Sequence, residues 1–172
     1  GVDCSDHEVN IKILLSQADG LAREDRNQLL RDMQDEVETL VLRSNYLQSQ
    51  AITQMQVQAQ KRMGAMTHLI TTLERRGILD REVEDLPDNE SLRERLVRNE
   101  PLTRPELSVL VSYGKIFVYQ ELLESDVPED PYLTRELVAY FPTQLRENYR
   151  HLMDQHPLKR EIIATVVTNS MV

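Results

Sequence analysis

The sequence contains a single cysteine, no tryptophan and only five glycines in 172 residues. One thiol excludes an intrachain disulfide and fits a reducing compartment. The glycines are all more than ten residues apart, whereas a phosphate-binding loop needs closely spaced glycines so that its backbone can approach the phosphates. The sequence therefore predicts no nucleotide-binding loop of its own.

Long apolar runs are also missing. The first apolar stretch, residues 11–15, is too short for the apolar part of a signal peptide and follows acidic residues. No later run approaches the length that a bilayer span requires. The mean hydropathy of −0.47 and the 28% of charged residues are typical of a globular protein in water. We expect a cytoplasmic protein without a membrane partner.

Positive charge is in short supply. Lysine and arginine number 20 against 29 aspartates and glutamates, which gives a formal net charge of −9. Binding to a phosphate backbone requires a dense basic face. A nucleic-acid partner is therefore excluded, and we interpret the two small basic clusters, Arg75-Arg76 and Lys159-Arg160, as charges near helix ends.

What the sequence does contain is helical periodicity. Apolar residues recur every three or four positions between the prolines and glycines, and hairpin signals are scarce. This pattern predicts an all-α fold: an irregular bundle of about seven to nine helices in one domain, residues 1–172, with one core and no nucleotide-binding sheet. We expect helices over about residues 6–17, 26–55 and beyond, 63–76, 89–98, 104–124, 131–140, 142–153 and 158–172.

Two capping boxes are expected at helix starts. Ser5 is followed by Glu8, and Thr103 by Glu106, so that in each pair a hydroxyl and a carboxylate can satisfy backbone N–H groups. Pro105 falls in the first turn of the second helix, where a missing N–H costs nothing.

The backbone at three further places, residues 54–60, Gly77 and Gly114, can be interpreted from the sequence. Residues 54–60 alternate with period two, as a strand would, but glutamine, methionine and alanine favour helix, and we predict a helix there. Gly77 suits the left-handed position that closes a helix. Gly114, on a long apolar helix, is interpreted as the point where a neighbouring element approaches closely.

The start of the chain is crowded with groups that could ligate a metal: Asp3, Cys4, Asp6, His7 and Glu8. The spacing of Cys4 and His7 is tolerable for zinc, but no second cysteine or histidine pair accompanies it. We therefore predict no metal site and no catalytic residue. Cys4 is interpreted as a small packing residue, and Asp6 and Glu8 as acids favoured by the helix dipole.

Five blocks of the sequence, taken together and in order, resemble a known family. They are "GVDCSDHEVNIKI" (1–13), "LVLRSNYLQ" (40–48), "LTRPELSVLVSYGKI" (102–116), "DPYLTRELVAYFP" (130–142) and "HPLKREIIATVVTNSMV" (156–172). The resemblance is to the C-terminal part of the large bacterial NAD-specific glutamate dehydrogenases. It implies a portion of a longer chain, and the absence of an initial methionine agrees with that expectation.

The same resemblance implies a role for two residues. The first five residues are similar to the strand-to-helix turn of glutamate dehydrogenases in which a valine lines the substrate pocket and a serine binds the side-chain carboxylate of glutamate. By this resemblance Val2 and Ser5 contact substrate in the full enzyme. Ser5 as a helix cap is compatible with that role, since a hydroxyl beside free N–H groups also suits a carboxylate.

The resemblance implies that the longer enzyme deaminates L-glutamate with NAD, and that residues 1–20 end its catalytic domain while residues 21–172 form a helical bundle. We expect this chain alone to bind no NAD and to be inactive, to partner the rest of the same polypeptide, and to belong to a homo-oligomer. The alternative hypothesis is a non-enzymatic helical module that binds a partner through a groove beside residues 102–124.

Overall fold

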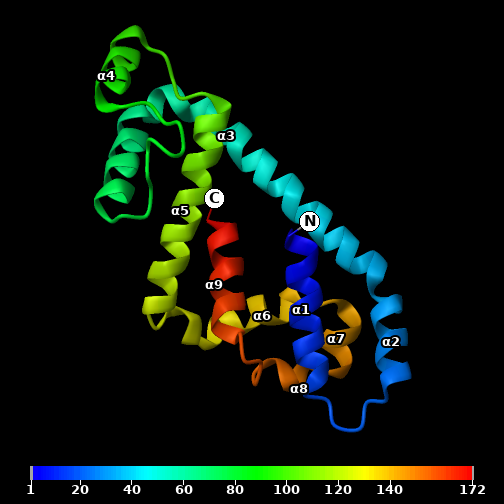
Figure 1. Ribbon diagram of the computed structural model, residues 1–172. Helices are drawn as coiled ribbons and strands as arrows, with labels where there is room; N and C mark the ends of the chain where they lie inside the picture. The colour runs from blue at the N-terminus through cyan, green and yellow to red at the C-terminus, as the bar shows by residue number, and fades with distance from the viewer. Residues whose placement is uncertain (1, 172) are drawn as a thin grey trace. The chain divides into compact units, whose positions relative to one another are not determined.

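The computed structural model describes residues 2–171, with side chains from Asp6 onward. In these residues the chain forms nine α-helices and two short 3-10 helices, and no strand. Figure 1 labels the α-helices along the chain. The helices are α1 (Val2–Ser16), α2 (Arg23–Asp32), α3 (Gln34–Arg75), α4 (Asn89–Arg98), α5 (Arg104–Glu124), η1 (Val127–Glu129), η2 (Pro131–Leu133), α6 (Thr134–Tyr140), α7 (Thr143–Asn148), α8 (Arg150–Met153) and α9 (Lys159–Ser170). The all-α prediction is confirmed. None of these helices combines the length and apolarity needed to cross a membrane.

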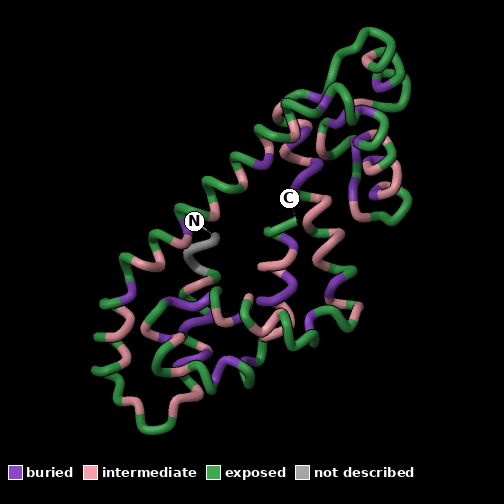
Figure 2. Tube along the Cα trace, turned by 180° about the vertical axis from the view of Figure 1, so that it is seen from behind, coloured by how far each residue is buried: buried purple, intermediate pink, exposed green. Residues whose placement is uncertain are grey.

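The first of two compact units, unit 1, consists of the residues up to Tyr46 together with Leu122–Met171. Helix α1 packs in its core with the short helices α6 to α9, and Figure 2 shows buried stretches recurring along these helices. The most deeply buried side chains include Leu14, Leu137, Phe141, Leu145 and Met153. Because α6 to α9 are short, each contributes only one or a few side chains to this core.

The second compact unit, unit 2, spans Leu47–Glu121. It contains the larger part of α3, all of α4 and most of α5. Its core joins side chains of α3, α4, α5 and the connecting segments: Ala59, Met63, Met66, Ile70, Leu73, Leu79, Leu86, Leu92, Leu102, Leu107 and Leu110. The described residues therefore form two cores, whereas the length of the chain had suggested one.

The length of α3 explains the second core. Its 42 residues extend over about 63 Å at the usual rise of an α-helix. A compact domain of this chain's size has a radius of gyration of only about 15 Å. A helix of this length has more residues than one core of this size can bury, and residues of α3 fall in both units.

Helix α3 also decides two of the sequence-based predictions. Residues 54–60 lie inside it, so the helical interpretation of their period-two pattern is confirmed. The separate helices expected before and after residue 60 are one continuous helix. At its end, Gly77 has a φ of +68°, and the N–H groups of Gly77 and Ile78 donate to the carbonyls of Glu74 and Leu73 at 2.9 and 3.0 Å. This pair of bonds closes the helix as predicted.

The capping residue Glu106 at the start of α5 behaves as expected. Its carboxylate accepts the Thr103 N–H at 2.7 Å and two bonds from Arg95 of α4 at 2.8 and 2.9 Å. Burial alone would raise the pKa of Glu106, but these bonds outweigh it and lower the pKa. Glu106 thus fixes the start of α5 and ties it to α4.

The interpretation of Gly114 is wrong. A methyl group added at this position would meet its nearest neighbour, Cδ2 of Leu69, at 3.9 Å, which is an ordinary van der Waals distance. The position has room for a side chain, so close approach does not require glycine here.

Candidate functional site

Helix α1 carries the residues that the sequence singled out. It begins at Val2, earlier than the helix predicted to start after Ser5, so Ser5 lies within the first turns of α1 and does not precede them. Glu8 forms an ion pair with Lys12 one turn further on. The predicted Ser5–Glu8 capping box is therefore wrong. The side chains of Val2 and Ser5 lie outside the described residues, and their contact with substrate remains a prediction.

A cluster of polar side chains joins α1 to α6 within unit 1. The hydroxyl of Tyr140, at the end of α6, donates to Oδ2 of Asp6 at 2.9 Å. Nδ2 of Asn10 donates to the same hydroxyl at 2.9 Å and to Oδ1 of Asp6 at 3.2 Å. The three groups thus form a closed ring of hydrogen bonds between two helices that are 130 residues apart in sequence. We call Asp6, His7, Asn10, Tyr140 and His156 the α1 cluster.

Aromatic packing surrounds this ring. The imidazole of His7 stacks on Tyr140 with the ring centroids 4.3 Å apart and an angle of 18° between the planes. Tyr140 meets Phe141 edge to face at 5.2 Å, and Phe141 lies 5.7 Å from His156. These contacts hold the rings in place, because offset stacked and edge-to-face pairs are the favoured aromatic geometries.

His156 forms a second tie to α1. Its Nδ1 accepts the Leu158 N–H at 3.1 Å, which places the ring proton on Nε2. Nε2 lies 3.1 Å from the Asn10 carbonyl oxygen and donates to it. His156 is 3% exposed, and burial lowers its pKa despite the Asn10 carbonyl and Glu161, which act in the opposite direction. The ring is therefore neutral at physiological pH.

The protonation of Tyr140 follows from the same physics. Burial raises the pKa of its phenol; the bond from Asn10 acts against this, while the charge of Asp6 and the bond to it raise the pKa further. Tyr140 therefore stays protonated and can donate to Asp6 while accepting from Asn10.

Asn10 is costly to keep in this position. It is 4% exposed, and its Oδ1 has no hydrogen-bond partner among the described side chains. An unsatisfied buried polar atom destabilises a fold by about 1–3 kcal/mol. The α1 cluster therefore fixes a geometry at some expense of stability.

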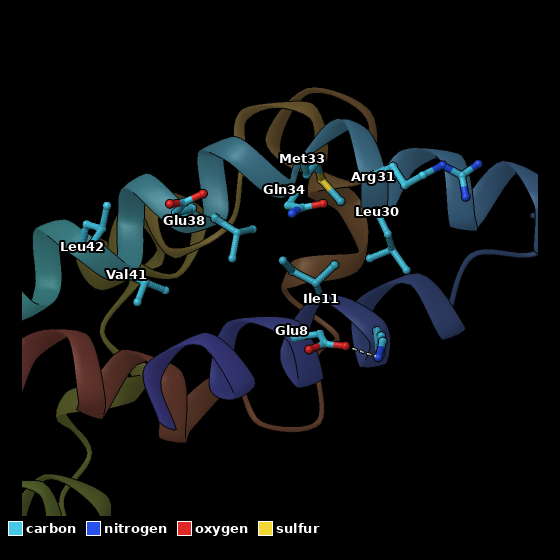
Figure 3. A pocket seen from close by; sticks show the side chains of 11 residues that line it. Glu8, Ile11, Leu30, Arg31, Met33, Gln34, Glu38, Val41 and Leu42 are labelled. Carbon is cyan, nitrogen blue, oxygen red and sulfur yellow. Dashed lines mark hydrogen bonds and ion pairs between the residues drawn. The ribbon is translucent and has the colours of Figure 1, made fainter. Parts of the chain in front are cut away.

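An apolar cleft of about 610 Å³ lies on another side of α1, against α2 and the start of α3, within unit 1. In Figure 3 the side chains of Leu30 and Val41 point toward α1. Glu8 and Lys12, which form an ion pair, also line the cleft. Aliphatic side chains make up most of its walls. Such an apolar surface is suited to contact with other apolar groups and not to catalysis.

The described residues do not fit a dinucleotide. NAD sites use a strand followed by a glycine-rich turn and a helix N-terminus that meets the pyrophosphate. Gly77, however, lies at the C-terminal end of α3, where the helix dipole repels phosphate, and Gly64 and Gly114 lie inside helices. In the part of the chain that the structure describes, no group of three potential metal ligands comes together. Asp6 and Glu8 instead contact Tyr140 and Lys12.

The sequence did not predict that Tyr140 and His156 would contact Asn10 of α1. One signal was available: Asp6 and Asn10 share a helix face at a spacing of four, next to the buried Ile11 and Leu14. A polar pair beside an apolar stripe indicates a distant partner without identifying it. Tyr140 and His156 gave no signal, because they meet α1 only in the folded chain.

Two family comparisons match the chain at its two ends. The family described as "Bacterial NAD-glutamate dehydrogenase, catalytic domain" matches residues 1–55. The family described as "Glutamate dehydrogenase, C-terminal" matches residues 99–172. The first match thus extends past residue 20, where we expected the catalytic domain to end; that boundary remains a prediction.

Individual relatives match the whole chain. The NAD-specific glutamate dehydrogenases of Pseudomonas aeruginosa and Halomonas elongata are 49% and 48% identical to it over 175 residues, and that of Mycobacterium tuberculosis is 36% identical. The chain spans 11% of the length of each. Both family matches, one at each end of the chain, are to glutamate dehydrogenases, so they agree on the class of protein that this helical segment resembles. The chain thus resembles one segment of the bacterial NAD-specific glutamate dehydrogenases along its whole length, which confirms the resemblance read from the five sequence blocks.

Proposed function

We propose that the chain acts as the C-terminal helical portion of an NAD-dependent glutamate dehydrogenase. The longer enzyme oxidatively deaminates L-glutamate to 2-oxoglutarate and ammonium while NAD is reduced. The observation that carries this proposal is the 36–49% identity to NAD-specific glutamate dehydrogenases along the whole chain. Such identity favours the enzyme over a separate helical interaction module.

Within that enzyme the chain contributes α1, whose first turns carry Val2 and Ser5. Ser5 hydrogen-bonds the side-chain carboxylate of glutamate, and Val2 lines the pocket. NAD and the groups that transfer hydride and protons come from the rest of the polypeptide, because the described residues do not fit a dinucleotide. The chain by itself is inactive, and the complete enzyme is a cytoplasmic homo-oligomer.

A segment exchange tests this proposal. The matching segment of the Pseudomonas aeruginosa enzyme is replaced by this chain, and the glutamate-dependent formation of NADH is measured. We expect activity comparable to that of the unmodified enzyme and none from the chain alone. A correctly assembled but inactive exchange enzyme would contradict the proposal, and NADH formation by the chain alone would contradict its inactivity.

The substrate contact has its own test. In the exchange enzyme, Ser5→Ala should raise the KM for glutamate about tenfold by removing one hydrogen bond to a charged group. The KM for NAD should not change. An unchanged KM for glutamate would show that Ser5 does not bind the substrate.

A further inference from the structure

The α1 cluster is more elaborate than packing of α1 requires. Leu14 and Ile11 already bury the apolar face of the helix. Well-packed apolar side chains stabilise a core at least as well as a buried polar network. The cluster instead includes an unsatisfied Oδ1 on Asn10. What a closed ring of directional bonds adds is a single orientation of the helix.

The cluster acts on the part of α1 that precedes the core. Asp6, His7 and Asn10 occupy the turns that directly follow Ser5, and all three contact Tyr140. A helix is stiff over so short a distance, with a rise of about 1.5 Å per residue. Fixing the rotation of α1 at Asp6 and Asn10 therefore fixes where the Ser5 Cα stands.

Tyr140 is the center of this arrangement. Its side chain contacts three other members of the α1 cluster: it donates to Asp6, accepts from Asn10 and stacks on His7. It is 8% exposed, while Asp6 reaches the surface. A buried, neutral phenol at the end of α6 thus holds an exposed carboxylate of α1 in one direction.

We propose that Tyr140 is a positioning residue for glutamate binding: through Asp6 and Asn10 it sets the orientation of the first turns of α1 and so the placement of Ser5 against the substrate carboxylate. This inference rests on the proposed function. Misplacing a binding group by a fraction of an ångström weakens substrate binding even where the group itself is intact.

The decisive variant is Tyr140→Phe in the exchange enzyme. It keeps the ring and its stacking on His7 but removes the hydroxyl that bonds Asp6 and Asn10. We expect the KM for glutamate to rise about tenfold, with kcat changed less than about twofold and the KM for NAD unaffected. A fall in kcat at constant KM would overturn the proposal.

Tyr113→Phe provides a matched control. The Tyr113 hydroxyl donates to Oε1 of Glu84 at 2.6 Å within unit 2. The variant therefore also removes one bond between a tyrosine and a carboxylate, but not one that reaches α1. We expect its kinetic constants to match those of the parent. If both variants raise the KM for glutamate equally, Tyr140 has only a general structural role.

A double variant tests whether Tyr140 acts through Ser5. If it does, adding Tyr140→Phe to Ser5→Ala should raise the KM for glutamate no further than Ser5→Ala alone. Effects that multiply would contradict the mechanism. In the exchange enzyme, Ser5→Ala could raise the KM for glutamate while Tyr140→Phe leaves it unchanged. That result would contradict this inference but not the proposed function.

Hydrogen exchange in the chain itself supplies a measurement independent of activity. Tyr140→Phe should speed exchange of the backbone amides of residues 6–10 at least about tenfold relative to Tyr113→Phe, because the tie to α6 is lost. Unchanged hydrogen exchange at these residues would overturn the inference, even if the enzyme that carries the replaced segment were inactive.

Discussion

Replacing Arg81 by methionine should destabilise unit 2 strongly. The guanidinium of Arg81 forms two bonds with the Glu74 carboxylate, and it donates to the Pro87 carbonyl at 3.1 Å and to Oδ1 of Asn89 at 3.0 Å. Its side chain is 9% exposed. These bonds connect the end of α3 to the start of α4 across the loop between them, so Arg81 fixes that loop.

The magnitude follows from what the substitution leaves behind. Removing one partner of a buried ion pair costs about 3–5 kcal/mol, largely because the other charge stays buried. The Glu74 side chain is 35% exposed and can regain water. The lower end, about 3 kcal/mol, is therefore expected for the loss in free energy of unfolding of unit 2. Methionine preserves the apolar stem of the side chain, so this figure reflects mainly the lost polar bonds.

Urea unfolding of the chain, followed by far-ultraviolet circular dichroism, measures this loss. Arg98→Met is the matched control, because Arg98 pairs with Glu94 on α4 with side chains 62% and 57% exposed. Such a pair contributes only about 0.5 kcal/mol. Arg81→Lys, which keeps the charge but not the planar fork, should fall between the two. If Arg81→Met unfolds at the same urea concentration as Arg98→Met, the reasoning is refuted.

Two further predictions concern the stability of the chain. Gly114→Ala should stabilise unit 2 by about 1 kcal/mol, because alanine favours the helix and the site has room for a methyl group; a lower thermal midpoint would contradict this. Because burial lowers the pKa of His156 below its ordinary 6.5, the unfolded chain takes up a proton first as the pH falls, so the stability of unit 1 should decrease below about pH 6.5 and level off below the folded pKa. His156→Gln should remove this dependence in urea unfolding at several pH values, and His151→Gln, at an exposed position, should keep it.

Local chemistry made much of the fold predictable. The Thr103–Glu106 pair and Gly77 act through backbone groups a few residues away, so their spacing is enough to place a helix start and a helix end. The same reasoning failed at Ser5, because α1 begins at Val2 and Glu8 finds Lys12 instead of the backbone. The backbone N–H groups at a helix start compete with every other partner that a capping side chain can reach.

The candidate site was predictable only in its position along the chain. The crowded N-terminal residues pointed to α1, but Tyr140 and His156 contact Asn10 from 130 and 146 positions away. Periodicity shows which face of a helix is apolar and not which helix will cover it. Chain length alone suggested one core, whereas the described residues form two.

The division of unit 1 into two stretches of sequence has a consequence during protein synthesis. Unit 2 is continuous, Leu47–Glu121, and all its core residues are synthesised before Phe141 and Leu145. Of the helices described, α1 precedes its packing partners α6 to α9 by the whole length of unit 2. Until those helices are made, Ile11 and Leu14 lack the apolar side chains of α6 to α9 that bury them, and such transiently exposed apolar surface is prone to aggregation.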